Sequence, residues 1–511
     1  MTESADIDLQ LMRAMQHHEA GRLHEADDGY AQVLKLQPHH AQALRLRGIL
    51  ARNAGDIEQS IQWLTAAVNA GSASAAARAE LGLSLMTAGR LQAAETQLRA
   101  ARDRAPNALD VLTNLGALLQ HRGHVREAVQ LYREVVAQDS SEFEVRCNLS
   151  KALADAGELD AALQEAEAAV ADANGNRGTL AALGAVLVDA RRYPAAAEVL
   201  ADAVRREPQD DMARVNLALC HAELDALPEA IRVLQAALSR NPHNARAAAD
   251  LINYLSGAGD IGAALQLGEQ FLAAHPGERL VVGSYAQALF DAGQTAQALE
   301  FCDCAQLVQE LALEVPTGFG SADAFNAALR EQLLGDPSLL NDPVGKATTG
   351  GAQTGELDLD GAAVLQGFGA AANAAVQTAI DEYRVRGLKN HALMEVAAPR
   401  WHLRAWGTLL RAGGKQSPHM HPLGWLSAVY YVDLPADLPA EHAEAGWLEF
   451  GRPPERYRRR IEPPTRRYEP AAGKLIVFPS WFWHRTLPFK SDAPRISIAF
   501  DVMPAGQHSE L

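Results

Sequence analysis

The chain has 511 residues, of which 48% are hydrophobic and 21% charged, and its formal net charge is −17. This length exceeds what a single hydrophobic core normally holds, so we expect two or more domains. The acidic balance argues against a general affinity for nucleic acid or for an anionic membrane surface. The sequence has no apolar run of membrane-spanning length, no basic and apolar leader at its N-terminus, and only 4 cysteines. We therefore expect a reduced, cytoplasmic protein.

A repeat of 34 residues runs through the first part of the chain. Glycines recur in phase with it, at Gly21, Gly55, Gly89, Gly123, Gly157, Gly259 and Gly293. Prolines recur half a period later, at Pro38, Pro106, Pro208, Pro242 and Pro276. Glycine permits a tight turn, proline ends a helix, and the apolar residues between them have helical spacing. The pattern predicts one helical hairpin per repeat. It resembles an all-α tetratricopeptide (TPR) array of about eight to nine units over residues 5–312, wound into a superhelix with a concave groove.

A column of polar residues follows the same period. Asn114, Asn148 and Asn216 occupy one position of three repeats, and Asp250 and Ser284 share that register. In peptide-binding members of this repeat class, asparagines at this inner-helix position hydrogen-bond an extended backbone. A solvated polar face would produce the same column. We expect the groove to recruit a polypeptide or a carrier-bound substrate, and we expect neither nucleic acid nor membrane as a partner.

The stretch that follows the repeats has mixed character. Residues 301–314 are typical of a final helix, a further helix begins at Phe325, and residues 361–383 have the composition of a helix that backs the next domain. Residues 346–354 are small and turn-forming, which predicts a loop.

From about residue 400 the chain changes to short alternating runs bounded by turn residues, which predict β-strands. The runs cover residues 402–410, 426–432, 446–450, 474–478 and 496–500. Such a set of antiparallel strands is typical of a double-stranded β-helix, the jelly-roll barrel of the cupins. We therefore expect a multidomain protein in which residues 313–511 form this barrel with flanking helices.

Three histidines in this region have the layout of a metal site. His419 and His421 lie one residue apart at a predicted strand end, and His484 follows 63 residues after His421. Imidazole nitrogens brought together on a barrel are ligands for a transition metal. Arg495 comes eleven residues after His484, and Ser497 lies two positions further on. A planar guanidinium can bind a carboxylate through two hydrogen bonds, and the serine hydroxyl adds a third donor.

This ordered set of motifs resembles the Fe(II)/2-oxoglutarate-dependent oxygenases, in particular a bacterial family often found behind tetratricopeptide repeats. The resemblance covers most of residues 315–511. The motifs that carry it are His419-x-His421-Pro422, residues 426–432, residues 473–480, Trp483-His484 and Arg495-Ile496-Ser497.

The resemblance implies a cofactor and a reaction. Its candidate Fe(II) ligands are His419, His421 and His484. Its candidate binding residues for the cosubstrate 2-oxoglutarate are Arg495, Ser497 and Tyr430, with Tyr431 and Trp406 as further candidate walls of the pocket. It also implies O2 as the oxidant and a reaction, typically a hydroxylation, that splits 2-oxoglutarate into succinate and carbon dioxide while an unactivated C–H bond is oxidised.

One residue departs from the superfamily pattern. Where a carboxylate normally stands two residues after His419, this chain has His421. The metal could be held by all three histidines, by two histidines and water, or with a carboxylate from Glu449 or Asp433. Two further hypotheses remain open. One is a repeat scaffold whose oxygenase domain is catalytically silent, and the other is a three-histidine cupin-type dioxygenase that does not use 2-oxoglutarate, against which Arg495 argues.

Residues 452–467 contain seven arginines within an acidic chain. We expect this segment to connect two barrel strands, either solvated or docked against an acidic surface of the repeats. Alternatively, it forms a rim that steers an acidic substrate toward the metal.

Overall fold

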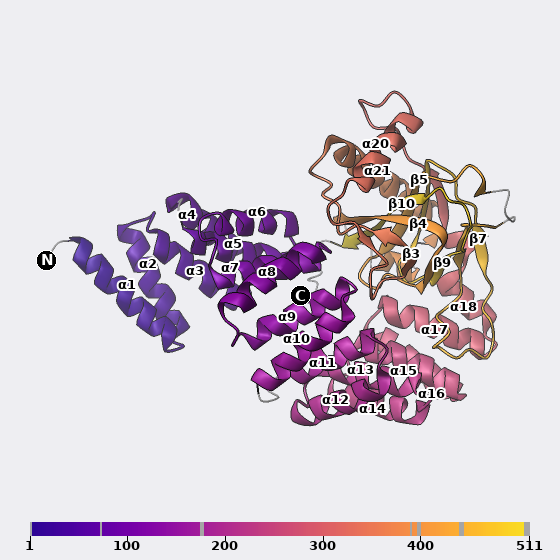
Figure 1. Ribbon diagram of the computed structural model, residues 1–511, viewed down its shortest axis with the longest axis horizontal. Coiled ribbons are helices and arrows are strands. Elements are labelled where there is room, and N and C mark those ends of the chain that lie inside the picture. Colours follow the sequence, from indigo (N-terminus) through magenta and orange to yellow (C-terminus); the bar gives the residue numbers. More distant parts are fainter. Residues whose placement is uncertain are drawn as a thin grey trace. The chain divides into compact units, whose positions relative to one another are not determined.

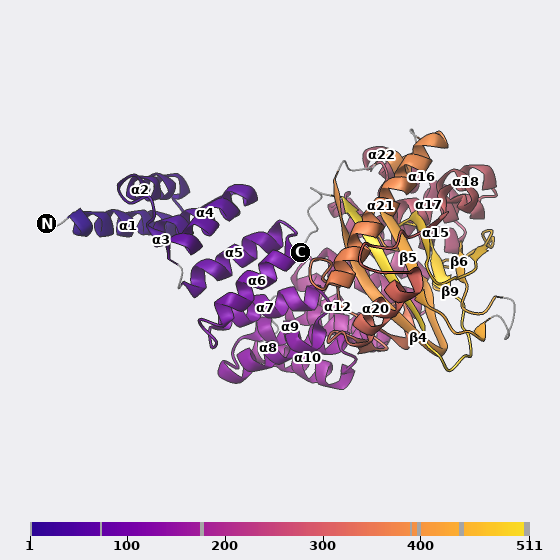
Figure 2. The same ribbon diagram turned by 90° about the horizontal axis from the view of Figure 1, so that it is seen from above.

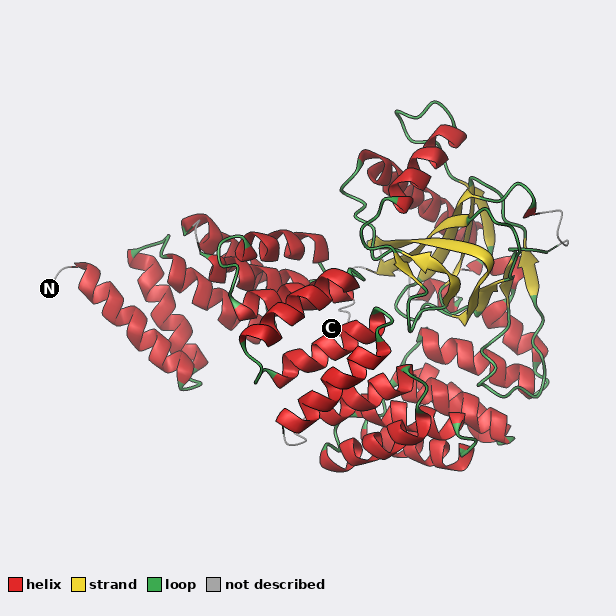
Figure 3. Ribbon diagram, viewed as in Figure 1, coloured by secondary structure: helices red, strands yellow, loops and turns green. Residues whose placement is uncertain are grey.

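The computed structural model describes residues 3–71, 74–173, 178–388, 391–395, 400–438 and 444–504. Contacts divide the chain into two compact units, the first with residues 1–122 and 127–145 and the second with residues 123–126 and 146–506. The first unit is helical, and the second combines helices with a curled antiparallel sheet (Figures 1 and 3). Within the described ranges, no helix has the length and apolar character needed to cross a membrane.

The first unit is a succession of antiparallel helical hairpins. Its helices are α1 (Glu3–Glu19), α2 (Leu23–Leu36), α3 (Ala41–Asn53), α4 (Ile57–Ala70), α5 (Ala75–Thr87), α6 (Leu91–Arg102), α7 (Leu109–His121) and α8 (Val125–Gln138). The same alternation continues into the second unit with α9 (Phe143–Asp155), α10 (Leu159–Asp172), α11 (Thr179–Asp189), α12 (Tyr193–Arg206), α13 (Asp211–Glu223), α14 (Leu227–Arg240), α15 (Ala245–Ala258), α16 (Ile261–Ala274), α17 (Arg279–Asp291) and α18 (Thr295–Cys302).

Backbone geometry accounts for the periodic glycines. Gly21 and Gly55 end their helices with φ of 72° and 84°, in the left-handed region that favours glycine. Where the sequence lacks glycine in this phase, Arg191 and Asp225 adopt the same conformation, with φ of 54° and 59°. The array therefore continues in phase through both positions. The predicted array of tetratricopeptide hairpins is confirmed.

Small residues let the two helices of a hairpin cross closely. A Cβ added to Gly48 of α3 would lie 2.5 Å from Cγ of Leu64 on α4, and one added to Gly82 of α5 would lie 2.7 Å from Cγ of Leu98 on α6. Real Cβ atoms essentially never approach a neighbour this closely, so larger residues would push the helices apart. Gly116 of α7 and Gly184 of α11, which follow Gly48 and Gly82 in phase with the 34-residue repeat, make the same close approach to the second helix of their hairpin.

The rest of the second unit is built on a 10-stranded antiparallel sheet. Its strands are β1 (Gln309–Ala312), β2 (Leu340–Asn341), β3 (Thr348–Gln353), β4 (Trp401–His419), β5 (Leu426–Asp433), β6 (Leu448–Phe450), β7 (Arg466–Tyr468), β8 (Lys474–Pro479), β9 (His484–Thr486) and β10 (Arg495–Pro504). The strand order is β1-β8-β5-β10-β4-β9-β6-β7, and β3 joins β2 to β4. The predicted strand-rich barrel domain is confirmed.

Two helices cover one face of this sheet: α20 (Ala322–Leu334) and α21 (Ala363–Val385). Figure 2 shows them lying across the strands. Phe368 of α21 contacts the rings of Tyr430 and Phe500, at centroid distances of 5.7 and 6.1 Å. Because side chains alternate along a strand, the residues next to these in β5 and β10 face the other side of the sheet. That other side carries the candidate site. Two short helices, α19 (Cys304–Leu307) and α22 (Ala392–Glu395), complete the described elements.

Two local predictions were wrong. The helix predicted over residues 301–314 ends at Cys302; after the short α19 the chain extends into β1, which pairs with β8. The loop predicted over residues 346–354 contains β3, which pairs with β4. In both places a distant strand supplies the hydrogen bonds, and local composition carries no signal of it. The sheet thus begins a few residues before the expected boundary at 312/313.

Candidate metal centre

The three candidate histidines come together beside the paired strands β4 and β9. His419 is the last residue of β4 and lies opposite His484, the first residue of β9. Their ring centroids are 4.2 Å apart, and the ring of His421 lies 5.1 Å from His419 and 5.0 Å from His484. One nitrogen from each ring lies within 4.8 Å of the other two. The three side chains therefore form one cluster, as three ligands of a single metal ion would.

Hydrogen bonds to oxygen atoms fix the tautomer of each histidine. His419 Nδ1 lies 2.8 Å from the carbonyl oxygen of Ser417, and His484 Nδ1 lies 2.9 Å from that of Phe482. A carbonyl oxygen can only accept, so each Nδ1 carries the hydrogen and each Nε2 keeps its lone pair. Metal-binding histidines in proteins are held in this way. The arrangement therefore leaves Nε2 available as the ligand atom.

His421 is held by a carboxylate. Its Nδ1 lies 2.6 Å from Oδ1 of Asp501, and the hydroxyl of Ser427 donates to the same oxygen at 2.6 Å. Asp501 lies on β10, and its side chain is only 10% exposed. The sequence analysis missed both Asp501 and Ser427. A signal for Asp501 was present, because it directly follows the predicted strand 496–500 and lies four residues beyond Ser497, which is the same face once the strand extends to β10 (Arg495–Pro504).

Electrostatics keeps two of the imidazoles neutral. Burial, with a further contribution from the nearby His421 imidazole, lowers the pKa of His419 to about 3. Burial, then the neighbouring His419 and His421, holds the pKa of His484 well below its usual value of 6.5. Neutral imidazole is the form that binds a metal, so these two residues need lose no proton at neutral pH.

The carboxylates considered from sequence do not join the histidines. Asp433 forms an ion pair with Arg330 at 2.9 Å. Glu449 is fully buried and accepts from Arg485 at 2.6 Å and from Arg467 at 2.7 Å. Since its neighbour Phe450 pairs with His484 across β6 and β9, Glu449 points to the opposite face of the sheet. In the described part of the chain, the metal-binding cluster consists of the three histidines.

A buried arginine lies on the same face of the sheet. Arg495 is 1% exposed, and among the described residues it forms no ion pair. Its guanidinium carbon lies 4.9 Å from the ring centroid of Tyr431, and its Nη1 lies 3.5 Å from the hydroxyl of Ser497. Its Nε is buried without a hydrogen-bond partner. Burial opposes the charge and lowers the pKa of Arg495. A buried cation without a counter-ion is costly, which indicates a site for an anion.

Further polar side chains surround this guanidinium. Ser497 lies opposite Tyr431 on β5 and opposite Thr408 on β4, so all three side chains share its face. The hydroxyl of Thr408 is buried without a hydrogen-bond partner among the described residues, and the hydroxyl of Tyr431 interacts with the guanidinium of Arg495. Trp406, two residues before Thr408, has its ring 5.3 Å from that of His421. The face therefore runs from the arginine past Trp406 to the histidines, and it offers donors for a small carboxylate.

Tyr430 is not part of this group. Its hydroxyl donates to Oδ1 of Asn326 at 2.6 Å, and its ring packs against Phe368 on the helix-covered face. The adjacent residue Tyr431 points toward Arg495 instead. The alternation of side chains along β5 separates the two tyrosines, and the sequence alone does not say which of them faces inward.

The asparagine column lies on first helices of the repeats. Asn114 is on α7, Asn148 on α9 and Asn216 on α13, and each is partly buried. Asp250 and Ser284 continue the register on α15 and α17 and are buried. The two ends of the column therefore differ in exposure.

Comparison with known proteins agrees with both halves of this description. Residues 11–79, 79–143, 113–177 and 182–247 match a tetratricopeptide repeat family. Residues 404–501, which include all three histidines, Arg495 and Asp501, match the family described as "Putative 2OG-Fe(II) oxygenase". No curated protein gives a significant match.

Among solved structures the chain is similar to repeat proteins. It shares 20% identity with MamA over 33% of this chain and 92% of that one, at a TM-score of 0.30. It shares 16% sequence identity with Pseudomonas aeruginosa pilF over 43% of this chain and 98% of that one, at a TM-score of 0.38. It shares 18% sequence identity with YrrB, which is described as a TPR protein with an unusual peptide-binding site. The similarity covers 36% of this chain and 95% of that one, at a TM-score of 0.31.

The protein is thus a repeat protein with a strand-rich domain that carries a three-histidine cluster. More specifically, it combines tetratricopeptide repeats with a domain that matches the 2OG-Fe(II) oxygenase family named above.

Proposed function

We propose that this protein is an Fe(II)- and 2-oxoglutarate-dependent oxygenase, most simply a hydroxylase, and that its repeats recruit a polypeptide or carrier-bound substrate. The observation that carries the proposal is the combination on one face of the sheet of three oriented histidines with a buried arginine that forms no ion pair with any described residue. The donor set fits the group, because imidazole is a common ligand of iron. When bound, Fe(II), 2-oxoglutarate and O2 together would supply the oxidation, with succinate and carbon dioxide as the other products.

The protein's own residues would prepare this chemistry in two places. His419, His421 and His484 would hold the metal through Nε2, each kept in orientation by its Nδ1 hydrogen bond. Arg495 would bind the far carboxylate of the cosubstrate, with the hydroxyls of Ser497, Tyr431 and Thr408 as additional donors. Both ends of one dicarboxylate would then be recognised, the near end at the metal and the far end at the arginine.

The repeats support the second part of the proposal. Tetratricopeptide superhelices present a concave surface, and Asn114, Asn148 and Asn216 are partly buried on their first helices. Amides at these positions could hydrogen-bond the backbone of an extended peptide, which would deliver a substrate with little dependence on its side chains.

A second candidate function follows from the donor set. Three histidines with no carboxylate ligand are also compatible with a cupin-type dioxygenase that does not use 2-oxoglutarate. Arg495 favours the cosubstrate-dependent reaction, because none of the described residues forms an ion pair with this buried charge and a dicarboxylate would supply one.

Anaerobic titration of the full-length protein tests the proposal. Fe(II) is added first and 2-oxoglutarate second, while the visible absorption band of an iron-bound 2-oxoacid is recorded. We expect a band that requires 2-oxoglutarate, is absent in His484→Ala, and saturates at much higher 2-oxoglutarate in Arg495→Ala. Metal binding without the band would favour the three-histidine dioxygenase. If the protein binds no metal, the oxygenase function is refuted and a repeat scaffold remains.

A further inference from the structure

The arginine-rich segment between β6 and β7 lies in contact with the last repeats. Tyr457 is 5% exposed and donates to Oδ1 of Asp250 on α15 at 2.7 Å. The backbone N–H groups of Arg460 and Ile461 both donate to Oδ1 of Asp291 on α17, each at 3.0 Å. These are charge-assisted bonds to carboxylates that are themselves buried, so they are stronger than surface contacts. Of the alternatives considered from sequence, docking against the repeats is confirmed.

The repeats hold this segment much as a groove holds a peptide. The side-chain amide of Gln287 donates to the backbone oxygen of Ile461 at 3.3 Å, while Asp291 accepts from two consecutive backbone amides. Gly257 leaves room for the segment, since a Cβ there would lie 3.1 Å from Cβ of Arg458. Three of these bonds go to the backbone of the segment, and Tyr457 and Arg458 add one side-chain bond each. Bonds to the backbone are a usual feature of the binding of an extended peptide.

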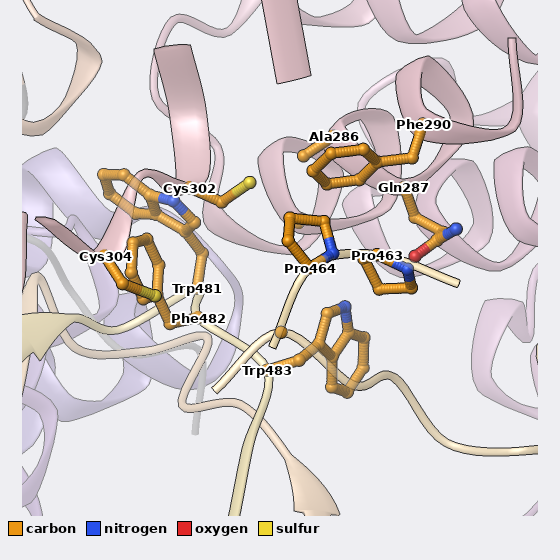
Figure 4. A pocket seen from close by; sticks show the side chains of 12 residues that line it. Ala286, Gln287, Phe290, Cys302, Cys304, Pro463, Pro464, Trp481, Phe482 and Trp483 are labelled. Carbon is orange, nitrogen blue, oxygen red and sulfur yellow. The ribbon is translucent and has the colours of Figure 1, made fainter. Parts of the chain in front are cut away.

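Proline and aromatic residues complete the contact on the barrel side. Pro463 and Pro464 lie across from Gln287 and Phe290 of α17, with Trp483 below them (Figure 4). The cavity that remains between these side chains measures about 40 Å³. This volume is far below the roughly 300–1,000 Å³ of typical ligand pockets. The segment is therefore packed against the repeats.

The segment also connects the repeats to a proposed metal ligand. The ring of Tyr457 lies 5.8 Å from the indole of Trp483, and Trp483 packs into the same apolar cluster as Tyr457 and the helices α14 to α17. Trp483 immediately precedes His484, and its carbonyl accepts from the backbone of Gly451 at 2.9 Å. The start of β9 is thereby fixed from both sides, by the barrel and by the repeats.

We propose that residues 452–465 are an internal ligand of the repeat groove and that Tyr457 is a positioning residue for His484. Asp250, which belongs to the same column as Asn148 and Asn216, is engaged by the chain's own segment. A partner peptide would therefore bind at the asparagines of the column, because Asp250 is already occupied by Tyr457. The positioning role rests on the proposed function, whereas the internal-ligand role does not.

Hydrogen–deuterium exchange on the full-length, metal-free protein tests the internal ligand. We expect the amides of Arg460 and Ile461 to be protected, and to exchange about tenfold faster in Asp291→Ala, which removes their acceptor. Tyr457→Phe, which removes the hydroxyl that donates to Asp250 and accepts from Arg456, should accelerate them by a similar factor. Asp225→Asn is the matched control: its partner Arg458 is 56% exposed, so we expect less than a twofold change. Exchange in the wild type at the rate of an unstructured peptide would overturn the proposal, as would no acceleration in Asp291→Ala.

Cobalt titration tests the positioning role. Co(II) is an air-stable probe whose visible spectrum reports ligand geometry. Tyr457→Leu removes the ring that contacts Trp483 and should weaken Co(II) binding about tenfold with a changed spectrum, whereas Tyr457→Phe should stay within threefold of wild type. Should Tyr457→Leu not fold, Trp483→Phe is measured instead, with the same expectation of weaker binding. Wild-type affinity and spectrum in Tyr457→Leu, or in Trp483→Phe where that variant is measured instead, would overturn the role of Tyr457. A wild-type protein that binds no Co(II) would instead refute the proposed function, and the exchange measurement would still decide the internal ligand.

Discussion

Replacing Arg495 by methionine should have opposite effects on ligand binding and on stability. Arg495 is 1% exposed, and among the described residues no carboxylate neutralises it. Replacing a buried ion pair with apolar residues of similar volume is often neutral or stabilising by about 1–4 kcal/mol, and a buried charge without an ion-pair partner has less attraction to lose. The lost contact with the ring of Tyr431 offsets about 0.5–2 kcal/mol of this gain. We therefore expect Arg495→Met to raise the unfolding free energy of the metal-free protein by roughly 1 kcal/mol.

The same substitution should nearly abolish cosubstrate binding. Removing one partner of a buried, hydrogen-bonded charge pair typically costs about 2–5 kcal/mol. At about 1.4 kcal/mol per factor of ten, the lower limit corresponds to a dissociation constant for 2-oxoglutarate about 30-fold higher. Arg495→Lys should lie between the methionine variant and the wild type, since it keeps the charge but loses the planar pair of donors.

Two measurements on the same variants check this prediction. Calorimetric titration of the Co(II)-loaded protein gives the affinity for 2-oxoglutarate. Urea unfolding of the metal-free protein gives the stability, and tryptophan fluorescence reports on the barrel because six of the seven tryptophans follow residue 400. Arg466→Met, at an exposed arginine of β7, is the matched control and should change neither quantity. The reasoning is refuted if Arg495→Met destabilises the metal-free protein by 1 kcal/mol or more, because the guanidinium would then already be satisfied within the fold.

Three further predictions concern the metal and the repeats. Co(II) at a hundredfold excess over its dissociation constant should stabilise the wild type by about 2.7 kcal/mol. The melting temperature should rise accordingly, and this rise should be absent in His484→Ala. Asp501→Asn should weaken Co(II) binding about 10- to 100-fold, with a smaller effect on the unfolding free energy of the metal-free protein. Titration with Co(II) measures the affinity, and an unchanged affinity would exclude a role for this carboxylate. On α16, Gly268→Ala should destabilise the protein by about 1–3 kcal/mol, since its Cβ would overlap the ring of Tyr285. Gly262→Ala, on the same helix with nothing near its Cβ, should stabilise by about 0.5–1 kcal/mol, and equal effects of the two in urea unfolding would contradict the packing argument.

Much of the architecture could be predicted from the sequence because it is repeated or local. A tetratricopeptide hairpin places the same demands on its turn in every unit, so seven glycines in phase predict the array even though Arg191 and Asp225 interrupt the series. The main barrel strands were equally evident from alternation, and His419, His421 and His484 were identified by their order along the chain.

The features that the sequence did not give depend on pairing between distant segments. The inward face of β5 is set by its register with β10, which shifts by a bulge between Ile496 and Ser497. That register places Tyr431 toward Arg495 and Tyr430 away from it. The contact of Tyr457 with Asp250 joins residues 207 positions apart, and no local pattern distinguishes Tyr457 from the other residues of an exposed loop. Strand β9 is only three residues long, too short to show an alternation.

The position of Asp501 bears on whether the substitution at His421 silences the site. A carboxylate bound directly to a metal contributes a full negative charge to it. In this protein the carboxylate of Asp501 lies behind His421, where it accepts the Nδ1 hydrogen of that imidazole at 2.6 Å. Such a bond transfers electron density to the imidazole and makes Nε2 a stronger donor. Because Ser427 holds Asp501 in place, the negative charge stays beside the three histidines proposed to bind the metal. The exchange of carboxylate for histidine is therefore no evidence by itself that the oxygenase domain is inactive.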